Sequence, residues 1–279
     1  MEYSRFRCEG VPAAKGITRA GQGMWAMAVP ELIRSAIEAH GGQARWDRVE
    51  AVEATLSASG FLFTAKRRPV LRRVRVRASA REVRFVFHDF PRAGETSELV
   101  GNDEVRVVGA DGSVLARRER PRLAFSGLRR QLYWDHLDFV YFGGYATWNY
   151  LVTPFLFLRE GFAFEALPPL QTPAGAWSRV RVTFPADLPT HSPTQDFYFD
   201  EQHLLRRLDY TAEVVGGWAH AAHVCEQMRE FDGLQVSTRR TVKPLPFGTR
   251  PLPLPTLVAI EIHDLRVRYE AGNGEFRTE

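Results

Sequence analysis

Two histidines are the best candidates for acid–base chemistry in this chain. An imidazole titrates near neutral pH, so it can donate or accept a proton during a reaction. His191 lies in residues 189–193 (PTHSP), and His220 lies near the start of an expected strand. We expect His191 in a loop at the rim of a barrel, either as an acid–base group or as an ordinary solvated loop residue.

His220 is expected to face the interior of the protein. On a strand it shares the parity of the large apolar residues Trp218, Val224 and Met228. His220 and His223 then point to opposite faces, because side chains alternate along a strand. Neither an HExxH nor a CxxC motif accompanies them, so we predict no metal site.

The uncharged, aromatic segment at residues 139–158 (FVYFGGYATWNYLVTPFLFL) could form the wall of a ligand site. Twenty residues would be long enough to span a membrane. Gly143, Gly144, Asn149 and Pro154 interrupt the segment, and Tyr and Trp prefer membrane interfaces. We therefore predict a buried helix that forms the floor or plug of an apolar cavity.

Helical spacing places four polar or aromatic residues of this segment on one face: Tyr141, Tyr145, Trp148 and Asn149. Such side chains could bind and orient a flat, apolar molecule. Tyr210 has the strand parity of Leu208, Ala212 and Val214 and should join them, together with His220. The alternative is a core helix whose polar groups are satisfied by the sheet, with Tyr210 and His220 as satisfied core residues.

These candidates must be positioned by a chain that is rich in expected strands. A helix is expected at about residues 30–40, ended by Gly41 and Gly42, and a helical block at about residues 121–157. About eleven or twelve strands in meander order account for the rest. Thirteen segments are the candidates for these strands: residues 52–56, 61–63, 70–77, 83–88, 105–108, 114–117, 162–167, 177–184, 195–199, 204–214, 218–231, 236–242 and 257–269.

The fold class that follows is mainly β (α+β). Sequential hairpins favour an antiparallel sheet, and a sheet this wide tends to curl. Helices over its open side would give an unclosed half-barrel. We expect a single domain at residues 29–270, a disordered N-terminal extension at residues 1–28 and a tail at residues 271–279. Met1, Met24 and Met27 are alternative starts.

Composition favours a soluble protein in a reducing compartment. Of the 279 residues, 44% are hydrophobic and 25% charged, and the net charge is only +4. Only three of the 37 basic residues are lysines, which we interpret as a codon-usage effect and not as a sign of nucleic-acid binding. Cys8 and Cys225 lie far apart, and no secretory signal is visible. We therefore expect a cytoplasmic location.

Nine basic residues lie between Lys66 and Arg84. They could contact an anionic membrane surface, or they could be the solvated outer face of strands. Aromatic residues are not interleaved with these arginines, which argues against binding of single-stranded nucleic acid.

Three stretches resemble the lipoprotein-carrier (LolA/LolB-like) superfamily, in a bacterial branch. One is AHGG at residues 39–42, followed by Trp46 and the strand at Val52. The second runs from residues 180–185 (VRVTFP) through 190–192 (THS) to the hairpin 197–210 (FYFDEQHLLRRLDY). The third is the turn 231–234 (FDGL) into 238–240 (TRR). The resemblance implies an unclosed antiparallel barrel with helices that cover an apolar cavity. That superfamily also contains a cofactor-free enzyme of the violacein pathway.

Three functions remain open. The first is binding of a hydrophobic small molecule or lipid in the cavity, without a cofactor. The second is a cofactor-independent enzyme that uses His191 or His220 as acid or base. The third is a peripheral protein that presents its arginine-rich strands to a membrane surface.

Overall fold

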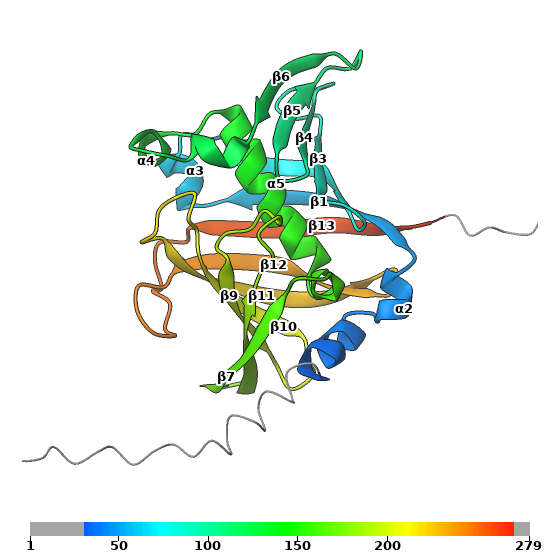
Figure 1. The fold of residues 1–279 in the computed structure, drawn as a ribbon, viewed down its shortest axis with the longest axis vertical. Coiled ribbons are helices and arrows are strands. Elements are labelled where there is room, and N and C mark those ends of the chain that lie inside the picture. The colour runs from blue at the N-terminus through cyan, green and yellow to red at the C-terminus, as the bar shows by residue number, and fades with distance from the viewer. Residues whose placement is uncertain (1–30, 271–279) are drawn as a thin grey trace, which may run out of the picture.

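The computed structural model describes residues 31–270, except the side chain of Arg129. In this part of the chain thirteen antiparallel strands form one sheet, in the order β6-β5-β4-β3-β2-β1-β13-β12-β11-β10-β9-β8-β7. Since β6 and β7 are its two free edges, the sheet is not closed into a barrel (Figure 1). The predicted mainly β half-barrel is confirmed.

The strands are almost all hairpin partners, as the alternating pattern predicts. Their bounds are β1 Val49–Ser59, β2 Leu71–Ser79, β3 Arg84–His88, β4 Thr96–Val100, β5 Glu104–Val108, β6 Val114–Glu119, β7 Ala163–Thr172, β8 Gly175–Thr183, β9 Thr194–Phe199, β10 Leu205–Thr211, β11 His220–Phe231, β12 Leu234–Pro244 and β13 Val258–Tyr269. The first and last strands, β1 and β13, pair in the middle and so join two wings of the sheet.

The main helix, α5 (His136–Val152), must cross the sheet because of this strand order. It lies in the connection from β6 to β7, which are opposite edges. Figure 1 shows α5 lying over the concave face. Asp135 and Asp138 begin the helix with a reciprocal capping box. The core therefore lies between α5 and the sheet, with Tyr141, Tyr145 and Trp148 fully buried.

Shorter helices surround this layer. They are a helix at residues 31–39, α2 (Gln43–Trp46), α3 (Phe61–Ala65), η1 (Pro121–Ala124), α4 (Arg129–Leu132) and η2 (Phe155–Leu158). The turn after the first helix needs glycine. Gly41 has a φ of 130°, and a Cβ there would lie 2.5 Å from the carbonyl oxygen of Gly233. Trp46 stacks on Phe155, with ring centroids 4.4 Å apart.

Two sequence-based assignments differ from the structure. Residues 61–63 form α3 and not a strand, because Gly60 turns the chain and the Phe61 and Leu62 amides bond to the Thr256 and Leu257 carbonyls. The strand β4 was not predicted. The expected extension and tail, with Cys8 and the alternative starts, lie outside the described residues and stay predictions. No helix within residues 31–270 is long and apolar enough to cross a membrane.

Candidate functional site

His191 lies in the protein interior and not in a solvated loop at the rim, so that expectation was wrong. Its side chain is 2% exposed, beneath the second half of α5. The loop between β8 and β9 folds inward because its polar groups have buried partners. Asn149 Nδ2 donates to the Pro189 carbonyl (2.9 Å), and Gln195 Nε2 donates to Thr190 Oγ1.

Three tyrosines surround His191. Nε2 lies 2.7 Å from the Tyr150 hydroxyl and Nδ1 lies 3.2 Å from the Tyr145 hydroxyl. A neutral imidazole has one donor and one acceptor, and the shorter distance fits an O–H donor. We therefore assign Tyr150 as donor to Nε2 and Nδ1 as donor to Tyr145. Tyr210 stacks on the imidazole at 3.9 Å, and its hydroxyl is 3.2 Å from that of Tyr150.

The electrostatics of this cluster oppose a role for His191 as a general acid or base. Burial, and to a lesser extent the charge of Arg122, lower the His191 pKa to about 3. Burial also raises the pKa of Tyr145 and Tyr150 well above its usual value. The cluster is thus neutral near pH 7, and both ring nitrogens of His191 already have partners. We conclude that it stabilises the fold around α5.

His220 is exposed and does not face the interior, which corrects the second expectation. Its Nδ1 is 2.8 Å from the Thr211 hydroxyl on the outer side. The parity argument failed because two of its three apolar residues do not face inward: Trp218 is 70% exposed, and Val224 is half-buried beside Glu226 and Arg239. The third, Met228, follows Gln227, which has a left-handed φ of 53° within β11. Beyond that residue the alternation shifts, so that Cys225 and Met228 both face inward. Counting back from Met228 therefore assigns His220 to the wrong face.

His223 occupies the inner position that was expected for His220. The side chain is fully buried, and neither ring nitrogen has a hydrogen-bond partner among the described residues. Its ring lies edge-on to that of Tyr150 at 4.4 Å. Burial lowers the His223 pKa well below its ordinary value, and the nearby charge of Arg240 lowers it further. Ala221 and Cys225 share the strand parity of His223 and are buried with it, so their small, apolar side chains were the sequence signal that could have found it.

An apolar cavity of about 50 Å³ lies between α5 and the middle of the sheet. Gly143, Ala146 and Tyr150 line it from the helix, at helical spacing. Ala58, Val242 and Ile260 line it from β1, β12 and β13. Tyr210 also lines it, as predicted, and places its hydroxyl beside that of Tyr150.

The four helix residues predicted to line this cavity do not line it. Tyr141, Tyr145, Trp148 and Asn149 lie on other faces of α5, which is buried almost all round. A helix that is apolar on every side has no periodicity to indicate which face meets a cavity. Whether any of the four contacts a ligand after a rearrangement stays a prediction.

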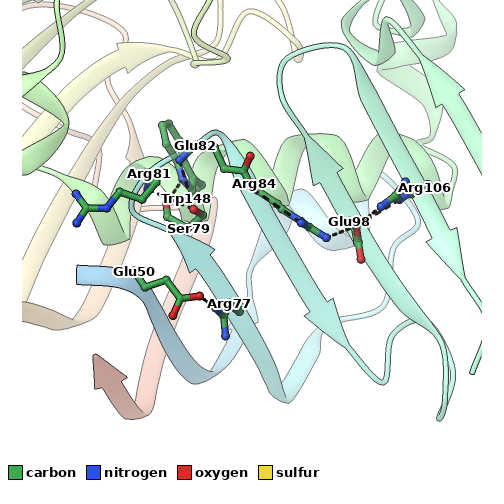
Figure 2. Close-up of polar contacts among 9 residues, drawn as sticks. All are labelled: Glu50, Arg77, Ser79, Arg81, Glu82, Arg84, Glu98, Arg106 and Trp148. Carbon is green, nitrogen blue, oxygen red and sulfur yellow. Dashed lines mark hydrogen bonds and ion pairs between the residues drawn. The ribbon is translucent and has the colours of Figure 1, made fainter. Parts of the chain in front are cut away.

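These four residues instead hold α5 in place. Trp148 Nε1 donates to the Ser79 carbonyl (2.9 Å), as Figure 2 shows. The Tyr141 hydroxyl donates to Asn102 Oδ1 (3.3 Å). Asn149 Nδ2 has two carbonyl acceptors, whereas its Oδ1 has no partner among the described residues.

Two cations line the cavity at its α3 end, and sequence reasoning singled out neither of them. Lys66 is 3% exposed, and its Nζ donates to the carbonyls of Arg130 (2.6 Å) and Gln131 (3.2 Å). Burial, with the nearby charge of Arg130, lowers the Lys66 pKa. Arg68 Nη2 lies 3.5 Å from His136 Nδ1, and the buried Arg68 Nε has no partner among the described residues. Burial lowers the Arg68 pKa, and the charges of Asp135 and Asp138 partly offset this effect. In residues 31–270 neither cation forms an ion pair with a carboxylate.

Four other arginines of the basic run, Arg75, Arg77, Arg81 and Arg84, form ion pairs with carboxylates. Figure 2 shows Arg77 beside Glu50, and Arg84 and Arg106 on either side of Glu98. Arg75 and Arg81 also pair, with Asp89 and Glu270. This arrangement matches the solvated-strand alternative and gives no support to membrane contact by these strands.

Metal-binding chemistry also finds no site in the described part of the chain. No cluster of three or more His, Cys, Asp or Glu side chains that could hold a metal ion occurs within residues 31–270.

Cys225 is buried, with Arg240 Nη1 3.3 Å from its Sγ. Burial raises the pKa of this thiol, which makes it a poor nucleophile.

Comparison with solved structures identifies the fold. A LolA superfamily protein from Nitrosomonas europaea matches with a TM-score of 0.51 at 11% identity, over 87% of this chain and 94% of that one. The fold is LolA-like. A DUF1329 family protein from Desulfovibrio piger matches 88% of this chain and 95% of its own, with 13% identity and a TM-score of 0.48. No protein-family model and no curated protein sequence matches the chain. The predicted resemblance is therefore confirmed for the fold.

Proposed function

We propose that the protein binds a small amphiphile, with the apolar part in the cavity under α5 and an anionic head group at Lys66 and Arg68. The observation that carries this proposal is the pairing of an apolar cavity with two cations that form no ion pair with a carboxylate in the described residues, although Asp135 and Asp138 act on the charge of Arg68 from a distance. A buried charge without a counter-charge is costly to maintain. An anionic ligand would supply that counter-charge. The LolA-like fold agrees with binding of a lipid or another hydrophobic ligand, and the proposal includes the expected cytoplasmic location.

The size of the cavity suggests which probes to use. A volume of about 50 Å³ has space for only a few methylene groups, so longer chains require α5 or α3 to shift. Each methylene that enters should improve affinity about fourfold, equivalent to about 0.8 kcal/mol. We expect the affinity of hexanoate, octanoate and decanoate, measured by calorimetry, to rise along the series.

Two pairs of variants separate the cavity from the head-group site. Ala58→Leu fills the cavity, whereas Ala54→Leu makes the same change at another buried position of β1 that does not line it. Arg68→Gln removes a cavity cation, whereas Arg67→Gln removes its exposed neighbour. Circular dichroism and thermal unfolding establish that each variant folds.

We expect Ala58→Leu to lower the affinity for both decanoate and neutral decanol by at least tenfold, equivalent to about 1.4 kcal/mol. Arg68→Gln should lower the affinity for decanoate and leave that for decanol unchanged. The proposal is wrong if the wild-type protein binds neither probe, or if Ala58→Leu binds both as well as Ala54→Leu does. If only the Arg68→Gln result fails, the apolar site remains and the anionic head group is rejected. The enzyme alternative has no comparable support, since His191 is fully engaged and His220 is exposed.

A further inference from the structure

Four segments meet at the α3 end of the half-barrel and are called the rim here: residues 60–70, 121–134, 211–220 and 243–257. They contain α3, η1, α4 and the loops β10–β11 and β12–β13, which all lie on the left in Figure 1. Hydrogen bonds join them into a ring around the cavity. These are Phe61 N to Thr256 O (2.9 Å), Lys66 Nζ to Arg130 O (2.6 Å), Gln131 Nε2 to Val215 O (2.5 Å) and Leu245 N to His220 O (2.9 Å).

The rim collects most of the exposed large apolar side chains. Of thirteen such residues in the described part of the chain, ten lie on the rim. Trp218 is 70%, Leu128 80% and Phe247 87% exposed, and they come from three different segments. The others on the rim are Phe61, Val70, Leu123, Leu132, Tyr133, Leu252 and Leu254. Such a concentration marks an interaction surface.

The rim is also strongly basic. Its four segments contain eight basic residues (Lys66, Arg67, Arg68, Arg122, Arg129, Arg130, Lys243 and Arg250) and one acidic residue, Glu213. Glu213 is already neutralised by Arg122, at 2.7 Å. Arg67 and Arg250 are exposed, and neither forms an ion pair with a carboxylate in the described residues. The surface thus combines apolar side chains with net positive charge.

We propose that the rim docks on the surface of an anionic lipid bilayer. Exposed Trp, Tyr and Phe side chains beside arginines suit the boundary between head groups and acyl chains. Acidic lipids supply the negative charge that the rim lacks. Each basic residue near the membrane surface contributes about 1 kcal/mol to the free energy of binding, which corresponds to about fivefold in partitioning. A second copy of the chain fits less well, because a symmetric dimer through the rim would bring two positive surfaces together. This inference shares Lys66 and Arg68 with the ligand proposal but rests on the exposed rim residues Trp218, Phe247, Arg67 and Arg250, so it does not depend on that proposal.

Co-sedimentation of the full chain with vesicles tests the proposal. One set of vesicles contains phosphatidylcholine alone, and the other contains phosphatidylcholine and phosphatidylglycerol in equal parts. Trp218→Ser/Phe247→Ser removes two exposed apolar rim residues, and Val114→Ser/Leu115→Ser removes two exposed apolar residues of β6 as a matched control. Arg67→Glu/Arg250→Glu reverses two rim charges, and Arg34→Glu/Arg229→Glu reverses two exposed charges elsewhere. All eight side chains are exposed, so the variants should fold.

We expect the wild-type protein to bind the anionic vesicles and not the neutral ones, with binding weakened by salt. The serine pair on the rim should lower partitioning at least tenfold, and the rim charge reversal at least twenty-fivefold. Both controls should bind within twofold of the wild type. The proposal is overturned if the wild type does not bind anionic vesicles, or if rim and control variants bind equally. It is also overturned if light scattering shows a dimer that anionic vesicles do not dissociate and that Trp218→Ser/Phe247→Ser abolishes.

Discussion

Replacing the buried His223 with phenylalanine should stabilise the protein. The side chain is fully buried, and neither ring nitrogen has a hydrogen-bond partner within residues 31–270. A buried polar atom without a partner costs about 1–3 kcal/mol. Phenylalanine keeps a flat ring without those polar atoms, at the cost of slight overpacking against Tyr150. We therefore expect the free energy of unfolding at about pH 8 to rise by about 2 kcal/mol.

The gain should increase as the pH falls. The His223 pKa in the folded protein lies well below the ordinary value of 6.5. Below pH 6.5 the unfolded chain therefore binds a proton that the folded protein does not, and wild-type stability falls with decreasing pH. At about pH 5 this proton costs the wild type at most about 2 kcal/mol, since each pH unit below 6.5 contributes at most about 1.4 kcal/mol. The side chain of His223→Phe binds no proton in either state, so the advantage of the variant should be larger at pH 5 than at pH 8, with an upper bound of about 4 kcal/mol.

Urea unfolding followed by circular dichroism at the two pH values measures both quantities. His220→Phe is the matched control, because it makes the same change at an exposed position of the same strand. We expect it to change the free energy of unfolding by less than about 0.5 kcal/mol. A His223→Phe variant less stable than the wild type at pH 8 would refute the unpartnered assignment. An equal advantage at both pH values would refute the lowered pKa.

Three further changes test the contacts of α5, each by urea unfolding. Tyr150→Phe removes the donor to His191 Nε2 and should lower the free energy of unfolding by about 2 kcal/mol; a neutral result would mean that His191 has another donor. Trp148→Phe removes the hydrogen bond to the buried Ser79 carbonyl and should cost about 2–4 kcal/mol; a smaller loss would show that the carbonyl finds a new partner. Asp138→Asn weakens the capping box and a buried ion pair and should cost about 3 kcal/mol, whereas an unchanged stability would contradict the role of the cap.

The strands were predictable because their signals are local. Alternating burial on β1, β5 and β12 follows the alternation of side chains along the chain. The Asp111-Gly112 turn between β5 and β6 was visible in the same way. The exceptions also have local causes. Gly60 ends β1 early, so residues 61–63 form α3.

The candidate site was less predictable because its residues meet across long distances in sequence. His191 and Tyr150 are separated by 41 residues, and no local pattern says that the loop holding His191 folds inward. The two cations of the cavity were visible only as members of a basic run. They differ from Arg75 and Arg77 because those two arginines form ion pairs with carboxylates, whereas Lys66 and Arg68 form none within residues 31–270.

The sequence by itself therefore determined the antiparallel sheet, the buried aromatic helix and their order along the chain, because strand alternation, turn residues and the absence of charge act over short spans. Only the tertiary structure decided which face of α5 meets the cavity, which histidine of β11 faces inward, and where four distant segments form the rim. Those features depend on how the two wings of the sheet pair through β1 and β13 and on the left-handed residue within β11. Packing over the whole chain sets them, and no short stretch of residues contains that information.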